Sequence, residues 1–378
     1  MKVLNFIVKK NFRNAFVVCL CAVQLLASCR KDERAVPKPM PVDEELKPFK
    51  DYKFSKEVLV FPDVVIGRLK SDGTYNKSST IGWTHPSVKY FEKKWNNHQY
   101  WMAITPYPSG VNEYENPTIF CSDDGKSWKE PGGIDNPIEK APPAPGYNSD
   151  VNLLFDNGKL YCFWRGMETV DPVNHKVING RTLLYKSSVD GVHWSEKKVI
   201  TTWNYLGIDL IAPAILKESN RYFCYGVCTG ETTPGAYYTN YAIRRSEVSS
   251  FDDVKVDRDK GYQLVNIATR PWGENEEPWH IEVKKFREKW YMMVSTTYNN
   301  QYGNGGRLFF GFSNDGISFT FGAKPICPLT NCYKSSFELY ENKKPGVSNI
   351  KLWRTSSSPW AVYFDEFSLE GYFDQSPV

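Results

Sequence analysis

The chain has 378 residues, of which 41% are hydrophobic and 24% are charged, and its formal net charge is +4. Four of its 47 Lys and Arg residues, but none of its 43 acidic residues, lie in the first 28 positions, so the rest of the chain is charge-balanced. This balance, together with the lack of a basic run interleaved with aromatics, argues against nucleic-acid binding, and the length suits one large core.

The first 28 residues are typical of a secretory signal. Basic residues up to Arg13 precede an apolar stretch at 15–26, which is short for a membrane span and is followed by small residues. The sequence Leu26–Cys29 resembles the lipobox of bacterial lipoproteins, which implies cleavage after residue 28 and lipidation of Cys29. We therefore expect an outer-membrane lipoprotein, at the cell surface or facing the periplasm. An uncleaved anchor and an ordinary signal peptide are the alternatives.

A Pro-rich segment separates this signal from the rest of the chain. The stretch Ala35–Pro41 contains three prolines, and such composition favours an extended linker. We expect residues 29–50 to form the tether that follows the lipidated Cys29, and residues 51–378 to form one folded domain.

A two-strand phrase recurs about every 60 to 70 residues along this domain. Each copy has a short polar or small residue, an apolar strand, a turn and an aromatic-rich strand. The copies begin at His85, Asp150, Ala212, His280 and, in a weaker form, Ser335. A period of this size with strands inside each unit is the mark of a β-propeller. The sequence therefore predicts an all-β, five-bladed β-propeller, with about four antiparallel strands in each blade.

Two further patterns support this fold. The motif S-x-D-G-x-x-aromatic occurs at Ser122–Trp128, Ser188–Trp194 and Ser313–Phe319, and Asp-Gly between strands indicates a tight hairpin turn that needs positive φ. The apolar segment Val58–Gly67 precedes the first copy, and we expect it to pair with Trp360–Phe364. That pairing would join the N- and C-terminal strands, close the ring and cover exposed strand edges.

The inner strand of each blade lines the central channel, and alternate side chains face it. The leading residues of the copies, with Ser336 in the fifth, are therefore expected around one cavity. Carboxylates next to exposed aromatic rings suit a carbohydrate, because sugar ring faces stack on aromatics and hydroxyl groups need polar partners. The predicted substrate-binding residues are His85, His280, Trp83, Trp279, Arg165, Tyr107 and Ser336.

Several phrases of the chain resemble five-bladed propeller proteins related to the glycoside hydrolase 43 and 32 clan. They are His85–Val88, Tyr100–Tyr107, Glu115–Pro117, Tyr147–Asp150, Pro278–Val283 and Lys334–Phe337. The resemblance covers roughly residues 80 to 340, and it implies cleavage of a glycosidic bond by three carboxylates in the central pocket.

The resemblance departs from the clan's pattern in blade one, where the clan places its base and this chain has His85. The remaining acids offer a shifted catalytic set. In this set Asp150 is the base or nucleophile, Asp209 is the orienting partner, and Glu282 is the general acid. No metal-ligand spacing such as HExxH occurs, so the prediction includes no cofactor, with a structural calcium ion left open.

Three functions remain open from the sequence. The first is a glycoside hydrolase-like lipoprotein acting on an oligo- or polysaccharide. The second is a non-catalytic glycan-binding lipoprotein that works with other glycan-uptake proteins, which the His85 departure favours. The third is a sialidase-like enzyme, which the S-x-D-G turns suggest.

Overall fold

The computed structural model describes residues 46–67, 76–78, 82–142, 146–168, 180–203, 209–229, 242–248, 250, 263–267, 269–298 and 305–374. The predicted signal at 1–28 and the lipidation site Cys29 lie outside these residues. The compact unit begins at Leu46. Within it, no helix among the described residues has the length and apolar character needed to cross a membrane.

The fold is all-β, as the sequence predicts. Its helical elements among the described residues are three short 3-10 turns: η1 (Phe49–Asp51), η2 (Pro108–Gly110) and η3 (Asn112–Tyr114). Every long element among the described residues is a strand, and nearly all of the strand pairs are antiparallel.

The first three sheets follow one another along the chain. The first contains β3 (Trp83–Trp95), β4 (His98–Pro106) and β5 (Thr118–Ser122). The second contains β6 (Tyr147–Asp156), β7 (Lys159–Glu168), β8 (Gly180–Ser188) and β9 (Lys198–Trp203). The third contains β10 (Asp209–Glu218), β11 (Arg221–Thr229), β12 (Ala242–Val248) and β13 (Gln263–Leu264).

The remaining strands form two meanders and a separate small hairpin. One meander is β15 (Glu276–Phe286), β16 (Lys289–Tyr298), β17 (Gly306–Ser313) and β18 (Ser318–Phe321), with β14 (Asn266–Ile267) parallel to β18. The other is β20 (Ser336–Glu341), β21 (Ser348–Ser357) and β22 (Trp360–Ser368), and β19 (Cys327–Cys332) pairs with both β17 and β21. The strands β1 (Val64–Ile66) and β2 (Asn76–Ser78) form the separate hairpin.

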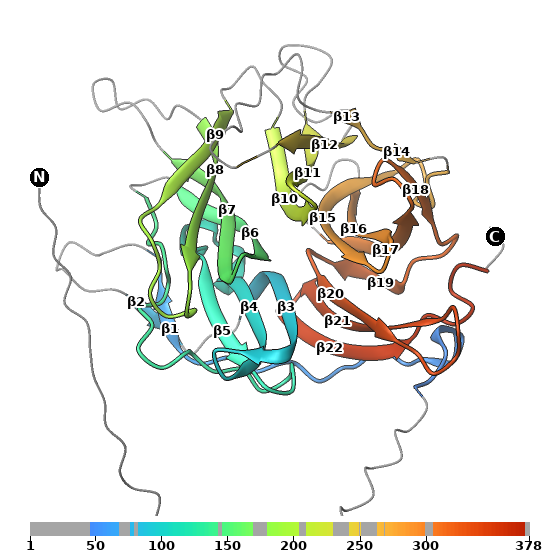
Figure 1. Ribbon diagram of the computed structural model, residues 1–378, viewed down its shortest axis with the longest axis horizontal. Coiled ribbons are helices and arrows are strands. Elements are labelled where there is room, and N and C mark those ends of the chain that lie inside the picture. Colours follow the sequence, from blue (N-terminus) through green and yellow to red (C-terminus); the bar gives the residue numbers. More distant parts are fainter. Residues whose placement is uncertain are drawn as a thin grey trace, which may run out of the picture. The chain divides into compact units, whose positions relative to one another are not determined.

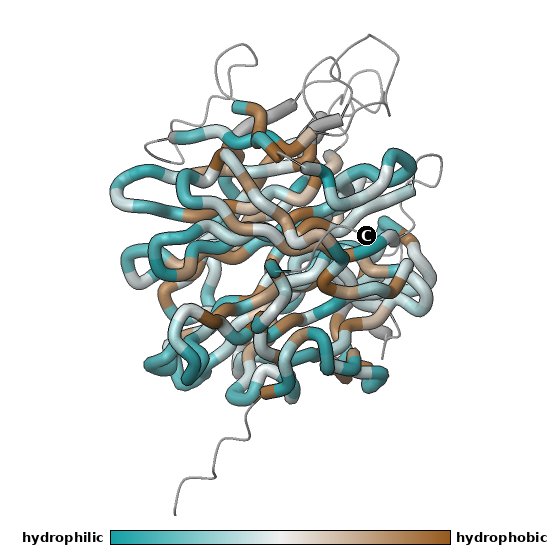
Figure 2. Tube along the Cα trace, turned by 90° about the vertical axis from the view of Figure 1, so that its right-hand side faces the viewer, coloured by the Kyte–Doolittle hydropathy of each residue, from teal (hydrophilic) through white to brown (hydrophobic). Residues whose placement is uncertain are grey.

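These sheets stand around a common centre, in a propeller-like arrangement (Figure 1). The innermost strand of each is its first long one, namely β3, β6, β10, β15 or β20. Apolar side chains fill the spaces between neighbouring sheets. Trp101 and Trp164 lie between the first two sheets, and Trp353 packs with Met102 and Phe120 between the last and the first. Hydrophilic stretches gather at the outer loops (Figure 2).

The N-terminal segment joins the last sheet, but through fewer residues than the sequence predicts. Val58 forms an antiparallel bridge with Tyr363, and the Leu59 N–H donates to the Val362 carbonyl oxygen at 2.8 Å. Val64–Ile66 pairs with β2 instead. The sequence predicts that residues 46–50 belong to the tether, yet Pro48 forms a bridge with Ser368, so this segment packs on the fold.

The three Asp-Gly turns have the conformation that the sequence predicts. Gly125, Gly191 and Gly316 have φ of 74°, 78° and 71°. In the last turn, the Asp315 carboxylate accepts hydrogen bonds from the backbone N–H groups of Ser318 and Ile317, both at 2.7 Å. These backbone hydrogen bonds stabilise the ionised form and lower the pKa of Asp315 to about 2.

We predict that Asp315→Asn removes a pH-dependent contribution to stability. The pKa of Asp315 is lower in the fold than in the unfolded chain, where it is about 3.9, so the carboxylate stabilises the fold above about pH 4. This contribution is lost as the pH falls toward the folded-state pKa. The gap in urea midpoint between wild type and Asp315→Asn should therefore narrow between about pH 6 and pH 3.

The matched control is Asp135→Asn, which removes an exposed carboxylate 3.8 Å from Lys140. A difference in urea midpoint between wild type and Asp315→Asn that is equally large at about pH 6 and about pH 3 would contradict the lowered pKa of Asp315.

Candidate functional site

One residue near the start of each of three inner strands adopts the left-handed backbone conformation. His85, Asp150 and Ala212 have φ of 58°, 57° and 50°, a region that non-glycine residues rarely adopt. Each lies in a β-bulge, where three steps along the inner strand match two steps along its partner. Strain of this kind persists where the surrounding structure enforces it, which is typical of functional centres.

His280 and Lys334 take the corresponding places in the other two inner segments. The β15 register shifts between Pro278 and His280. Ahead of β20, the Tyr333 N–H donates to the Thr355 carbonyl oxygen, while Ser336 is paired with Trp353, which gives the same three-to-two offset. The fifth residue of this layer is therefore Lys334, and the predicted Ser336 lies two residues further along the strand.

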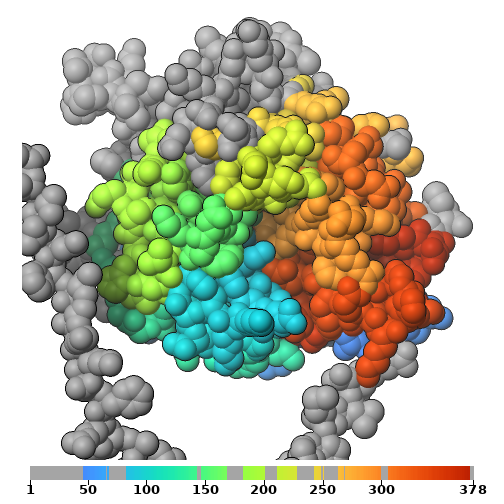
Figure 3. Space-filling view, viewed as in Figure 1, coloured from blue at the N-terminus to red at the C-terminus, as the bar shows by residue number. Residues whose placement is uncertain are grey.

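The inward-facing residues form two layers, one nearer the start of the inner segments and one two residues further along. We call the first the upper layer, and its residues are His85, Asp150, Ala212, His280 and Lys334. We call the second the lower layer, and its residues are Ser87, Asn152, Ala214, Glu282 and Ser336. The inner strands that carry both layers meet around the centre of the face seen in Figure 3.

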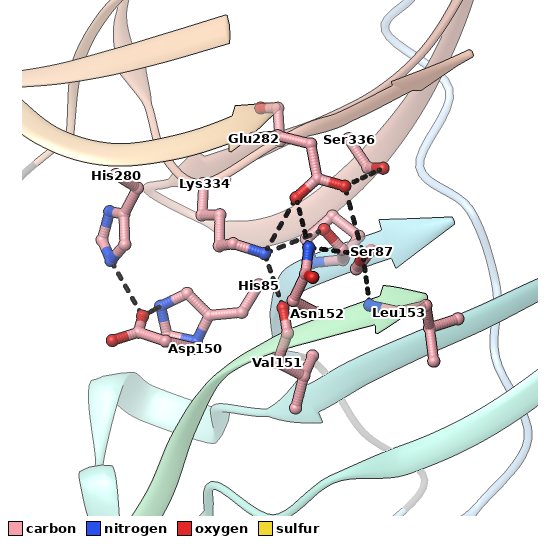
Figure 4. Close-up of polar contacts among 12 residues, drawn as sticks. His85, Ser87, Asp150, Val151, Asn152, Leu153, His280, Glu282, Lys334 and Ser336 are labelled. Atoms are coloured by element: carbon pink, nitrogen blue, oxygen red, sulfur yellow. Dashed lines mark hydrogen bonds and ion pairs between the residues drawn. The ribbon is translucent and has the colours of Figure 1, made fainter. Parts of the chain in front are cut away.

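The upper layer brings together three residues that the sequence predicts at the site. Asp150 Oδ1 lies 3.2 Å from His85 Nε2 and 3.2 Å from His280 Nε2 (Figure 4). One ligand atom from each residue lies within 4.8 Å of the other two, and all three side chains are buried. Despite this proximity, Asp150 Oδ1 and His85 Nε2 make no hydrogen bond of acceptable geometry to a described residue.

The Asp150 carboxylate is held as an anion by its neighbours. Burial opposes its ionisation, but Arg165, His85 and His280 outweigh that effect and hold the pKa of Asp150 well below its usual range. Arg165 Nε lies 2.7 Å from Oδ2, so the guanidinium engages one carboxylate oxygen and leaves Oδ1 facing the histidines.

The two imidazoles differ in how they are held. Burial lowers the pKa of His280 to about 3, so this ring is neutral near pH 7. His85 Nδ1 lies 3.2 Å from Glu115 Oε2 and 3.1 Å from Thr105 Oγ, and that hydroxyl donates to the Thr84 carbonyl oxygen. Because the Thr105 hydroxyl donates its own proton to Thr84, it accepts from His85 Nδ1, which places a proton on that nitrogen.

When His85 carries only the proton on Nδ1, the lone pair of Nε2 faces the anionic Asp150 Oδ1. Two electron-rich atoms at 3.2 Å repel each other in a buried site. Either a second proton on the imidazole or a cation between the two groups removes this repulsion. The donor atoms therefore fit a cation that binds nitrogen and oxygen ligands.

Aromatic residues lie beside the cluster formed by His85, Asp150 and His280. The Tyr333 ring centroid is 4.4 Å from that of His280, and Trp279 Nε1 donates to the Tyr333 hydroxyl at 3.1 Å. Trp360 packs edge-on against both Tyr333 and Tyr107, with centroids 4.8 and 4.5 Å apart. The predicted residues Trp279 and Tyr107 are thus close to the cluster.

Glu282 lies in the lower layer, in a closed hydrogen-bond network (Figure 4). Its Oε1 accepts from the hydroxyls of Ser87 and Ser336 at 3.1 and 3.3 Å. Its Oε2 accepts from Asn152 Nδ2 at 3.2 Å and lies 3.6 Å from Lys334 Nζ. The residue is 1% exposed, and both of its oxygens are engaged by protein groups. Ser336 belongs to this network and not to the cluster around Asp150.

Two other predicted residues do not join the cluster. Trp83 is 3% exposed and packs against Phe61 and Phe120, with centroids 5.2 and 5.4 Å away, so it belongs to the core between sheets. Asp209 is the first residue of β10, and its side chain lies outside the described part of the structure.

Sequence reasoning missed Glu115 and Lys334 as site residues. Glu115 comes from the loop between η3 and β5, outside the repeated phrases, although Glu115–Pro117 was among the segments that carried the clan resemblance. Lys334 was overlooked because Ser336 was aligned with the leading residues of the other copies.

Comparison with known proteins places the fold. No protein-family model matches the chain. The chain is 24% identical over 312 residues to an A type blood N-acetyl-α-D-galactosamine deacetylase of Flavonifractor plautii, covering 71% of this chain and 39% of that protein. The chain therefore spans about two fifths of the length of this curated relative.

Solved structures give the same picture. A crystal structure of an N-acetylgalactosamine deacetylase from F. plautii, in complex with blood group B trisaccharide, superimposes with a TM-score of 0.68. The match has 19% identity and covers 85% of this chain and 97% of that one. The GH32 β-fructofuranosidase BmSUC1 of Bombyx mori gives a TM-score of 0.50 at 11% identity, covering 75% and 60%. These likenesses concern the fold alone, which the chain shares with a deacetylase and with a glycoside hydrolase 32 enzyme.

We predict that Arg165→Met lowers the free energy of unfolding by about 3 to 5 kcal/mol when measured in a chelating buffer, because it leaves the buried Asp150 carboxylate without its guanidinium partner. Urea denaturation measures this loss. The control Arg221→Met removes an exposed ion pair with Glu247 and should change stability by less than about 1 kcal/mol. An equal decrease in the free energy of unfolding in the two variants would show that the Arg165–Asp150 pair stabilises the fold no more than an exposed ion pair does.

Proposed function

We propose that this protein is a carbohydrate-active enzyme that removes an acetyl group from an acetylated sugar, using a divalent cation held by His85, Asp150 and His280. The observation that carries the proposal is the single Asp150 oxygen that faces two imidazole nitrogens, with the proton of His85 held on the far side of its ring. The similarity to an N-acetylgalactosamine deacetylase supports the choice of reaction.

The donor set fits a divalent transition-metal ion. Two imidazole nitrogens and one carboxylate oxygen are common ligands of such ions, and three protein ligands leave a position free for substrate. Glu115 Oε2 lies 3.2 Å from His85 Nδ1, and a carboxylate behind a ligating histidine favours this tautomer and orientation of the ring. A bound divalent ion would supply a Lewis acid that polarises an acyl carbonyl.

Protein groups around the cluster have separate roles in this proposal. Arg165 holds Asp150 as an anion, so that Oδ1 is available as a ligand. The Tyr333 hydroxyl accepts from Trp279 and keeps its own proton available for donation. Burial raises the pKa of Tyr333 well above its usual range, so it stays a neutral donor suited to an oxyanion. The rings of Tyr107 and Trp360 offer apolar faces for a sugar.

Glycosidic hydrolysis has less support from these contacts. That reaction needs one carboxylic acid free to protonate the leaving oxygen and a second carboxylate across the bond. Glu282, the predicted acid, has both oxygens engaged inside a buried network, and Asp150 is held as an anion between Arg165 and two histidines. We therefore propose a structural role for Glu282.

The wider organisation is part of the same proposal. We infer that the meanders beginning with β3, β6, β10, β15 and β20 are five blades of one propeller. We also propose, from the lipobox-like sequence, that the enzyme is anchored in the outer membrane through Cys29, where it meets extracellular glycans.

We predict release of acetate from N-acetylated hexosamine glycosides, with a matching gain of free amine and no cleavage of aryl glycosides. EDTA should abolish the release, and Zn²⁺ or Mn²⁺ should restore it. Asp150→Asn and His280→Ala should each lower the rate more than about 100-fold, because they remove ligands and not merely their supports.

The control for these variants is Asp156→Asn, on the same strand β6, whose carboxylate pairs with Lys217 at 2.7 Å. This variant should keep the wild-type rate. Three outcomes would contradict the proposal: acetate release that resists EDTA, cleavage of aryl glycosides without acetate release, or saturable sugar binding without turnover.

A further inference from the structure

Lys334 has surroundings that its sequence position does not suggest. Its side chain is completely buried, and it follows β19 in the upper layer of the channel. Its Nζ donates to the Val151 carbonyl oxygen at 2.6 Å and lies 3.5 Å from the Pro86 carbonyl oxygen (Figure 4). A buried ammonium group is costly unless it is paired and hydrogen-bonded, so this position calls for a reason.

The two carbonyl groups that Lys334 reaches belong to the strained bulges. Pro86 follows His85, and Val151 follows Asp150, and neither pair of residues has a partner in the strand register. Residues inside a bulge are left out of the ladder of backbone hydrogen bonds. Lys334 therefore supplies, from a third segment of the chain, a donor that both bulges lack.

Glu282 balances the charge of Lys334 in the lower layer. Its Oε2 lies 3.6 Å from Nζ, and Ser87, Asn152 and Ser336 hold the carboxylate in place. Two of these residues, Ser87 and Asn152, directly follow the bulges on β3 and β6. Through Ser87 and Asn152, the Lys334–Glu282 pair thus connects the two strands that carry His85 and Asp150.

We propose that Lys334 is a positioning residue, which clamps the His85 and Asp150 bulges so that His85 Nε2 and Asp150 Oδ1 keep the separation needed to share one cation. The inference rests on the proposed function, because it takes these residues as metal ligands. Lys334 itself binds no metal in this scheme. Its ammonium group acts only on the backbone that carries the ligands.

The test compares metal affinity with stability in three variants. Lys334→Met removes the clamp, but it also takes from the buried Glu282 charge its nearest cation, leaving Lys284 Nζ at 3.9 Å from Oε1. The double variant Lys334→Met/Glu282→Gln removes that charge while keeping an amide to bond with the serines. The matched control is Arg354→Met, which breaks another buried ion pair, to Asp365 at 3.0 Å, away from the cluster.

Each variant is titrated with Zn²⁺ alone by calorimetry, at a temperature where its circular dichroism shows it folded, and its Tm is measured without metal. We expect Lys334→Met to have a lower Tm and a lower affinity for Zn²⁺ than wild type. The double variant should recover Tm, yet it should still bind Zn²⁺ about 10 to 100 times more weakly than wild type, the range typical of groups that support ligands. Arg354→Met should have a lower Tm than wild type and the same affinity for Zn²⁺.

Two results would overturn the inference in distinguishable ways. Wild-type affinity in the double variant, with Zn²⁺ bound normally by wild type, would show that Lys334 only pairs with Glu282, and the proposed function would stand. Failure of the wild-type protein to bind Zn²⁺ would remove the proposed function and the clamp together.

Discussion

Three non-glycine residues adopt left-handed backbone at the inner ends of neighbouring strands, and the chemistry of the channel follows from this constraint. Residues in this region cost about 1 to 3 kcal/mol each and persist only when their surroundings hold them. At His85 and Asp150 the bulges turn the side chains toward one point, where Asp150 Oδ1 faces two imidazoles. At Ala212 the same bulge carries a methyl group, which leaves that part of the layer without a polar group.

The groups around these bulges compensate the strain and the burial of charge. Above, Arg165 pairs with Asp150, and Glu115 Oε2 lies 3.2 Å from His85 Nδ1. Below, Lys334 reaches the bulge carbonyls, and Glu282 balances its charge. The pairs of opposite charge offset part of the cost of burying these ions. His85 Nε2 and Asp150 Oδ1 approach each other without a hydrogen bond, and a cation between them would satisfy both atoms.

Repetition made much of the fold predictable from the sequence. The period of the copies indicated the successive sheets, and the Asp-Gly turns appeared where expected because Ser and Asp side chains bond the turn's own backbone. The convergence of His85, Asp150 and His280 could also be predicted, since each leads an inner strand. Departures from strict alternation could not. A bulge resets which side chains face the channel, so Trp83 belongs to the core and Lys334 takes the place expected of Ser336. Glu115 comes from a loop outside the repeat, and the pairing of Glu282 depends on segments far apart in the chain.

The site shows why a propeller does not by itself specify a reaction. The fold is similar to that of a β-fructofuranosidase as well as that of a deacetylase, so the identity of the groups at the channel decides. The most direct measurement is an anomalous-scattering map from crystals grown with Zn²⁺. We expect one strong peak about 2.0 to 2.2 Å from His85 Nε2, Asp150 Oδ1 and His280 Nε2. A map with no peak there would contradict the proposed cation site.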